Sequence, residues 1–237
     1  MIDKKQRGFT IIEVMLFVAI SGLLVVLLLA GWTTNLNTQR YKDSVKSLQS
    51  FMQQQYNLVY NVENTRGNDL KCDPSSVSVD SVSPGAGDSR GSTKCVLLGR
   101  YITITTTSDG STAKVSAIIG KDTQVGSTDA EAIRNAQPAR VTQDIGLSES
   151  ELDVPWSATV SDDLTIAIIR SPLTGTARTY IASGSPSLTS MVAGPTGNDT
   201  DRRLCIDAGA PFSGEAMSVV LKANASSQSS VETAVGC

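Results

Sequence analysis

The hydrophobic positions of this chain fall into three successive patterns. From Val14 to Trp32 every residue is uncharged and most are apolar, which predicts a helix of about 20 residues, long enough to cross a bilayer. Apolar residues then recur at helical spacing to about Asn64, with polar residues between them, which predicts an amphipathic continuation of that helix. Residues 95–237 contain short segments rich in β-branched residues separated by turns, a pattern typical of strands.

The amphipathic half of the helix predicts what the helix packs against. Its apolar stripe consists of Tyr41, Val45, Leu48, Met52, Val59 and Val62, with Phe51 and Leu58 beside it. Residues 65–94 are rich in Ser, Pro and Gly, which predicts a loop with one short strand near Val77–Val82. The fold class is therefore α+β. A long N-terminal helix at 9–64, transmembrane at about 11–32, packs on an antiparallel β-sheet head at 95–237.

Turn signals divide the head into hairpins. Asp109-Gly110 separates predicted strands at Val96–Thr107 and Ala113–Ile119, and a Ser-Pro-Leu-Thr-Gly turn separates Leu164–Arg170 from Ala177–Ala182. The other expected elements are a short helix at Asp129–Ala136 and strands at Arg203–Asp207, Ala216–Ala223 and Ser230–Val235. Residues 184–201 are interrupted by proline and glycine and are expected to form an exposed loop.

Composition and charge narrow the classes of function. The formal net charge is −3, which argues against a general nucleic-acid binder, and no specific nucleic acid is predicted. The chain has no histidine and no C-x-x-C pair, so it cannot form a Ser-His-Asp triad or a His-ligated zinc site. The acidic pairs Asp162-Asp163 and Asp199/Asp201 lack calcium-loop spacing and are interpreted as solvated turns. We therefore expect no enzyme activity, no metal and no cofactor.

The segment before the apolar run is basic, with Lys4, Lys5 and Arg7, so the positive-inside rule predicts a cytoplasmic leader and an external head. A secretory signal would need a small-residue cleavage site after the run, where the sequence offers only a poor one. An ordinary membrane anchor explains all of these features except Glu13. A carboxylate costs free energy within a span, and an anchor gains nothing from it.

The residues Gly8-Phe9-Thr10-Ile11-Ile12-Glu13-Val14 resemble the processing site of type IV pilins. The resemblance implies that residues 1–8 are a prepilin leader, that a prepilin peptidase cleaves after Gly8, and that the new N-terminal Phe9 is methylated. It also implies that Glu13 is the assembly residue and that the apolar helix becomes the core of a filament. The implied partners are the prepilin peptidase, an inner-membrane platform protein, an assembly ATPase and other pilins, in a homo-oligomeric filament.

The resemblance implies a single-pass membrane protein before assembly and a cell-surface pilus afterwards. Surface adhesion, twitching motility and DNA uptake all remain open as uses of such a filament. One alternative is a pseudopilin of a type II secretion or DNA-uptake machine, since the N-terminal motif does not separate the two. An alternative of another class is a membrane-anchored extracytoplasmic binding module, in which Glu13 is incidental and the leader is retained.

The four cysteines, Cys72, Cys95, Cys205 and Cys237, all lie beyond the span, where export makes disulfides plausible. Four cysteines allow three pairings. We favour the two local ones, Cys72–Cys95 and Cys205–Cys237. The second resembles the C-terminal disulfide-bounded region of many pilins.

Overall fold

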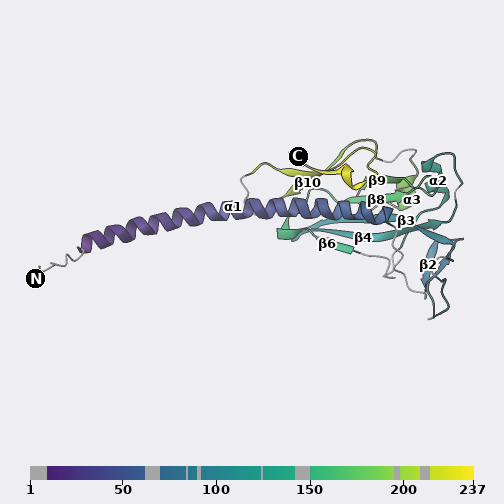
Figure 1. Ribbon diagram of the computed structural model, residues 1–237, viewed down its shortest axis with the longest axis horizontal. Helices are drawn as coiled ribbons and strands as arrows, with labels where there is room; N and C mark the ends of the chain where they lie inside the picture. The colour runs from purple at the N-terminus through teal and green to yellow at the C-terminus, as the bar shows by residue number, and fades with distance from the viewer. Residues whose placement is uncertain are drawn as a thin grey trace, which may run out of the picture.

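The molecule consists of a long helix, the N-terminal half of which projects from a β-rich head (Figure 1). This computed structural model describes residues 10–61, 70–83, 85–89, 92–123, 125–141, 150–194, 198–208 and 214–237. The helix α1 (Ile11–Tyr60) runs for 50 residues, a length of about 75 Å at the usual rise per residue. The predicted long helix is confirmed over this range, and residues 62–64 of the prediction lie outside the described residues.

Over the described residues the head contains three antiparallel sheets and two short α-helices. The largest sheet has the order β5 (Ala139–Arg140), β4 (Gly110–Lys121), β3 (Cys95–Thr107), β8 (Leu164–Arg170) and β9 (Ala177–Ser183), with β6 (Ser150–Asp153) also paired to β4. The second has the order β12 (Val231–Val235), β11 (Met217–Leu221), β10 (Arg202–Asp207) and β7 (Thr159–Val160). The remaining elements are the hairpin β1 (Leu70–Asp73) and β2 (Ser78–Ser81), the helices α2 (Asp129–Asn135) and α3 (Leu188–Val192), and the 3-10 turns Pro155–Ser157 and Gln228–Ser230.

The hairpins expected from the turn signals are present. β3 pairs with β4 across the Asp109-Gly110 turn, and β8 pairs with β9 across the turn at residues 171–175. In β3 the register shifts between Leu97 and Gly99, which is a β-bulge. A Cβ on Gly99 would lie only 1.9 Å from the carbonyl oxygen of Ile168 in β8. Glycine is therefore required where these two backbones approach each other.

The core lies where the C-terminal half of α1 meets the inner faces of the two larger sheets. The helix contributes Tyr41, Val45, Leu48, Phe51, Met52, Tyr56 and Val59, all buried. They pack against Ile102, Ile104 and Ile166 of the six-stranded sheet and against Leu204, Val219 and Leu221 of the four-stranded sheet. The predicted apolar stripe is therefore confirmed where it is described. Leu58 is only half-buried, and Val62 lies outside the described residues.

A second apolar layer covers the outer face of the six-stranded sheet. Here α2 and α3 place Ile133, Leu188 and Val192 over Tyr101 and Tyr180. The predicted loop at 184–201 therefore contains a helix, α3, that the sequence pattern did not predict. Ser187 caps the N-terminus of this short helix, and its hydroxyl accepts a hydrogen bond from the Ser190 N–H group at 3.2 Å.

The segment predicted as a loop at 65–94 contains two strands rather than one. β1 was not expected, and it pairs with β2 over its whole length, from Leu70 opposite Ser81 to Asp73 opposite Ser78. The hairpin projects from the far end of the head (Figure 1). Its existence depends on pairing and on a covalent tie to β3, described below, rather than on a long apolar run of its own.

Candidate functional site

The first turn of α1 is closed by a capping box between Thr10 and Glu13. The Thr10 Oγ1 accepts a hydrogen bond from the Glu13 N–H group at 3.3 Å, and the Glu13 Oε2 accepts one from the Thr10 N–H group at 3.4 Å. These reciprocal bonds satisfy two donors that the helix itself leaves unpaired. The Glu13 side chain is exposed. The predicted cleavage and methylation residues, Gly8 and Phe9, lie outside the described residues.

The stretch Ile11–Leu29 is long and apolar enough to cross a membrane, with a mean hydropathy of 2.8 and no residue of that window buried against the head. Large apolar side chains are exposed on every side, with Ile11 80% and Phe17 71% exposed. The hydroxyl of Ser21 is satisfied inside the helix, where it donates to the Phe17 carbonyl oxygen at 2.7 Å. A helix that is apolar all round requires lipid or other apolar helices as its surroundings.

The other half of α1 is fixed to the head by polar contacts as well as by the core. At the end of the buried half that is nearer the span, the Tyr41 hydroxyl donates to the Ile206 carbonyl oxygen at 2.8 Å and accepts from the Met217 N–H group at 2.6 Å. Ser44 Oγ donates to the Pro155 carbonyl oxygen at 2.7 Å. These bonds join the helix to the four-stranded sheet and to the turn before β7.

Near the C-terminal end of α1, Tyr56 starts a buried chain of hydrogen bonds. Its hydroxyl lies 2.7 Å from Thr179 Oγ1 in β9, and Thr179 Oγ1 donates to the Ala225 carbonyl oxygen at 2.7 Å. Tyr56 is fully buried, and burial raises its pKa to about 12. The prediction of the apolar stripe omitted Tyr56, although it lies four residues after Met52 and three before Val59. That spacing was the signal that could have found it.

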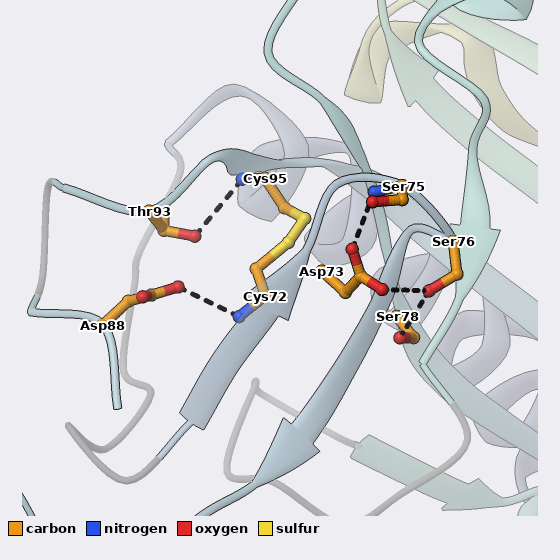
Figure 2. The surroundings of a disulfide bond; sticks show 8 residues. All are labelled: Cys72, Asp73, Ser75, Ser76, Ser78, Asp88, Thr93 and Cys95. Atoms are coloured by element: carbon orange, nitrogen blue, oxygen red, sulfur yellow. Dashed lines mark hydrogen bonds between the residues drawn. A yellow bond between two sulfur atoms is a disulfide. The ribbon is translucent and has the colours of Figure 1, made fainter. Parts of the chain in front are cut away.

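The predicted Cys72–Cys95 disulfide is present, with a Cα–Cα distance of 5.9 Å. It joins β1 to the first residue of β3 and so ties the small hairpin to the six-stranded sheet (Figure 2). Both backbone N–H groups of the pair are satisfied nearby: Cys72 donates to Asp88 Oδ2 at 3.0 Å, and Cys95 donates to Thr93 Oγ1 at 3.2 Å.

The predicted Cys205–Cys237 disulfide is not formed in the structure, where both residues are free thiols. The structure nevertheless brings the two thiols close enough to interact. Burial and this contact raise the pKa of Cys205. The chain turns back after β12 at Gly236, which has φ 92°, and Cys237 Sγ donates to the Met217 carbonyl oxygen of β11 at 3.6 Å.

The acidic pairs are used in turns and ion pairs. Asp163 Oδ1 accepts from the Thr106 N–H group at 2.8 Å, while Asp201 accepts from the Ala223 N–H group at 2.8 Å and lies 3.6 Å from Lys222 Nζ. Across the described part of the chain, no group of three or more His, Cys, Asp or Glu side chains could hold a metal ion.

The sequence did not predict one contact at the base of the head, which is the end of the head nearest the exposed half of α1. The guanidinium carbon of Arg40 lies 4.7 Å from the centre of the Trp156 ring, a cation–π geometry. The two residues are far apart in the sequence, and no local spacing connects them. Only the packing of the Pro155–Ser157 turn against α1 brings them together.

Comparison with family models identifies the N-terminal part of the chain. Residues 3–29 match the model described as the prokaryotic N-terminal methylation motif. The match covers the whole predicted processing site and nearly all of the span, so the chain carries a prepilin-type motif of the kind found in type IV pilins and pseudopilins. Comparison with curated proteins and with solved structures gave no match.

Proposed function

We propose that this chain, with its prepilin-type N-terminal motif, is a structural subunit of a type IV pilus filament. One observation carries the proposal. The motif at residues 3–29 includes the start of a single helix, α1, which is not buried against the head over Ile11–Leu29 and packs one face into the head from Tyr41 onward. A subunit built in this way can be stored in a membrane and later exchange lipid for the helices of neighbouring subunits. The apolar surface remains covered throughout.

The proposed sequence of events begins with insertion of the span and cleavage between Gly8 and Phe9 by a prepilin peptidase, which also methylates Phe9. The subunit is then held laterally in the membrane. An inner-membrane platform protein and a separate assembly ATPase extract it into a helical filament on the cell surface. The head contributes the outer wall of this filament, and the span contributes its core.

Glu13 is the proposed assembly residue, and its energetics support this role. A charged carboxylate costs about 2.5–3.5 kcal/mol near the centre of a bilayer and less toward its edge. Its capping bonds with Thr10 lower the cost in the isolated subunit. In a bundle of apolar helices, the amine of a neighbouring Phe9 would pair with the Glu13 carboxylate and offset much of the desolvation of both charges. Such a pair sets the axial register between neighbours, as single buried polar groups do in coiled coils.

Mass spectrometry of the N-terminal peptide from the native envelope or from sheared filaments tests the proposal. The expected peptide starts at Phe9 and carries one methyl group. A stable, abundant protein that keeps residues 1–8 would contradict it and would favour the membrane-anchored binding module. Electron microscopy then separates the two filament classes, because a pilus subunit forms surface fibres and a pseudopilin forms a short periplasmic rod.

A set of three variants separates the assembly role of Glu13 from its capping role. Glu13→Gln keeps an oxygen that can accept from the Thr10 N–H group but removes the charge, while Thr10→Ala removes the cap and keeps the charge. We expect Glu13→Ala and Glu13→Gln to be inserted and processed but to yield few filaments. Thr10→Ala should assemble nearly normally. Equal loss in Thr10→Ala and Glu13→Ala, with normal yield in Glu13→Gln, would reduce Glu13 to a capping residue.

A further inference from the structure

The base of the head carries an exposed aromatic and cationic pair whose geometry is unusual. Trp156 is 55% exposed, and Arg40 lies over its ring at 4.7 Å. Both Trp156 and Ser157 have left-handed backbone conformations, with φ 63° and φ 54°. Such conformations are unfavourable for residues other than glycine, and they persist only where the surroundings impose them.

The surroundings of this turn do impose that conformation. Ser44 of α1 donates to the Pro155 carbonyl oxygen, and the turn is fastened to β4 on both sides by backbone bonds. The Val154 N–H group donates to the Ser111 carbonyl oxygen at 2.8 Å, and the Ser111 N–H group donates to the Ala158 carbonyl oxygen at 3.2 Å. The strained turn therefore holds a large apolar ring outside the core rather than inside it.

A hollow of 230 Å³ lies between the ring and α1, lined by Asn37, Tyr41 and Ala208 among others. The guanidinium of Arg40 borders it and is exposed. No carboxylate among the described residues forms an ion pair with Arg40. A cation without an ion-pair partner, beside an exposed tryptophan and a hollow of mixed polar and apolar lining, matches an anionic partner that also offers apolar surface.

The position of the pair along α1 indicates which partner this is. If the hydrocarbon layer begins at Ile11, a 30 Å core ends about 20 residues later, beside Trp32. Arg40 lies about nine residues further, or about 13 Å, and the headgroup layer occupies about 5–7 Å of that gap. Side chains on a helix lean toward its N-terminus, which is here the membrane side. A helix tilt of about 20°, the average for such spans, lowers one side of the head further.

We propose that Arg40 and Trp156 dock the base of the head onto the headgroup layer of an anionic membrane before assembly. Arg40 binds lipid phosphate, and Trp156 inserts its ring at the interface, as tryptophan does at membrane boundaries. Arg40 is the first charged residue after Glu13, and it directly precedes Tyr41, the first buried residue of α1 in the described chain. The contact would fix which face of the head turns toward the membrane. This inference rests on the membrane-stored state of the proposed function.

The chain supplies its own reporters for a test, because Trp32 and Trp156 are its two tryptophans. The full chain is placed at one copy per nanodisc in phosphatidylcholine with one fifth phosphatidylglycerol, with and without a nitroxide-headgroup lipid. Trp156→Phe leaves Trp32 as the reporter of insertion, and Trp32→Phe leaves Trp156 as the reporter of docking. We expect the nitroxide to quench both reporters.

Substitution of the cation tests the charge. In the Trp32→Phe background, Arg40→Gln should lower the ratio of docked to undocked heads by about five-fold, the contribution of one cation near an anionic surface. Arg140→Gln is the matched control, since Arg140 also lies over an aromatic ring, that of Tyr101, at 4.9 Å. It should leave quenching unchanged.

The possible results separate the two proposals. Quenching of Trp32 without quenching of Trp156 would overturn the docking inference and leave membrane storage intact. If neither Trp32 nor Trp156 is quenched, both the docking inference and the membrane-stored state are wrong. If Trp156 is quenched or shifted only in discs that hold two or more copies, the hollow is a contact between subunits, and the membrane inference is wrong.

Discussion

Tyr56 offers a sharp test of how α1 is fixed in the head. Its hydroxyl is fully buried and hydrogen bonded to Thr179, and its pKa is about 12 instead of about 10. The folded state therefore keeps this proton at a pH at which the unfolded chain has lost it. Stability from this group is complete below pH 10 and is lost as the pH rises toward 12. A difference of 2 units corresponds to about 2.7 kcal/mol in total, of which about 1.4 kcal/mol is lost at pH 11.

Tyr56→Phe removes this pH dependence and one hydrogen bond. At pH 8 the variant should be less stable by about 1 kcal/mol, the net value of a typical buried hydrogen bond. Between pH 10 and 11 the wild-type protein should lose stability faster than the variant, so that the two curves cross close to pH 11. Burial also raises the pKa values of Tyr41 and Tyr180, and their contributions cancel in the comparison.

Guanidinium unfolding of the full chain in detergent, followed by far-ultraviolet circular dichroism from pH 8 to 11, measures both curves. Tyr60→Phe is the matched control, because Tyr60 lies one turn later on α1 but is 41% exposed, with its hydroxyl bonded to the Ser226 carbonyl oxygen. A constant gap between wild type and Tyr56→Phe over this whole range would refute the reasoning, since it would mean that Tyr56 titrates alike in both states.

Three further substitutions test the packing and the cross-link. Gly99→Ala places a Cβ 1.9 Å from the Ile168 carbonyl oxygen, so we expect the free energy of unfolding to fall by about 3 kcal/mol and the melting temperature by about 6–12 °C. The control is Gly22→Ala, where an added Cβ would meet no atom within 4 Å, and it should leave the melting of the head unchanged. Leu48→Ala creates a cavity at a fully buried position and should cost about 2–5 kcal/mol in denaturant unfolding, whereas Leu36→Ala, at a 38% exposed position, should cost less than about 0.5 kcal/mol. Replacing both Cys72 and Cys95 by Ser opens a loop with a sequence separation of 23 and should lower the free energy of unfolding by about 3 kcal/mol, measured against the wild type without reductant. Equal stability would show that the β1–β2 hairpin unfolds independently of the sheet.

Local pattern was enough to predict the parts of the fold that local chemistry determines. Alternation and the Asp109-Gly110 turn predicted the β3–β4 hairpin, and helical spacing predicted the face of α1 that is buried. The N-terminal motif was equally readable, because its basic leader, Gly-Phe pair and Glu13 lie within a few residues of one another.

The elements that were missed depend on distant partners. α3 has three large apolar residues to indicate it, Leu188, Met191 and Val192, within a segment rich in Ser, Pro and Gly, and it is stabilised by packing over Tyr180. β1 is a strand because β2 and Cys95 hold it. Cys205 and Cys237 are a different case: both are free thiols, but they lie close together as the predicted pairing requires, so that disulfide stays a prediction.

The continuity of α1 between span and head has a mechanical consequence. In a filament held together by the spans, an external load would travel along the helix axis into the head. The buried contacts from Tyr41 to Val59 extend over about 27 Å parallel to that axis, so the load would act in shear on all of them together rather than peel them apart one after another. Resistance would then depend on the rate at which the whole interface yields. Fibre strength would thus be set by the length of the buried half of α1.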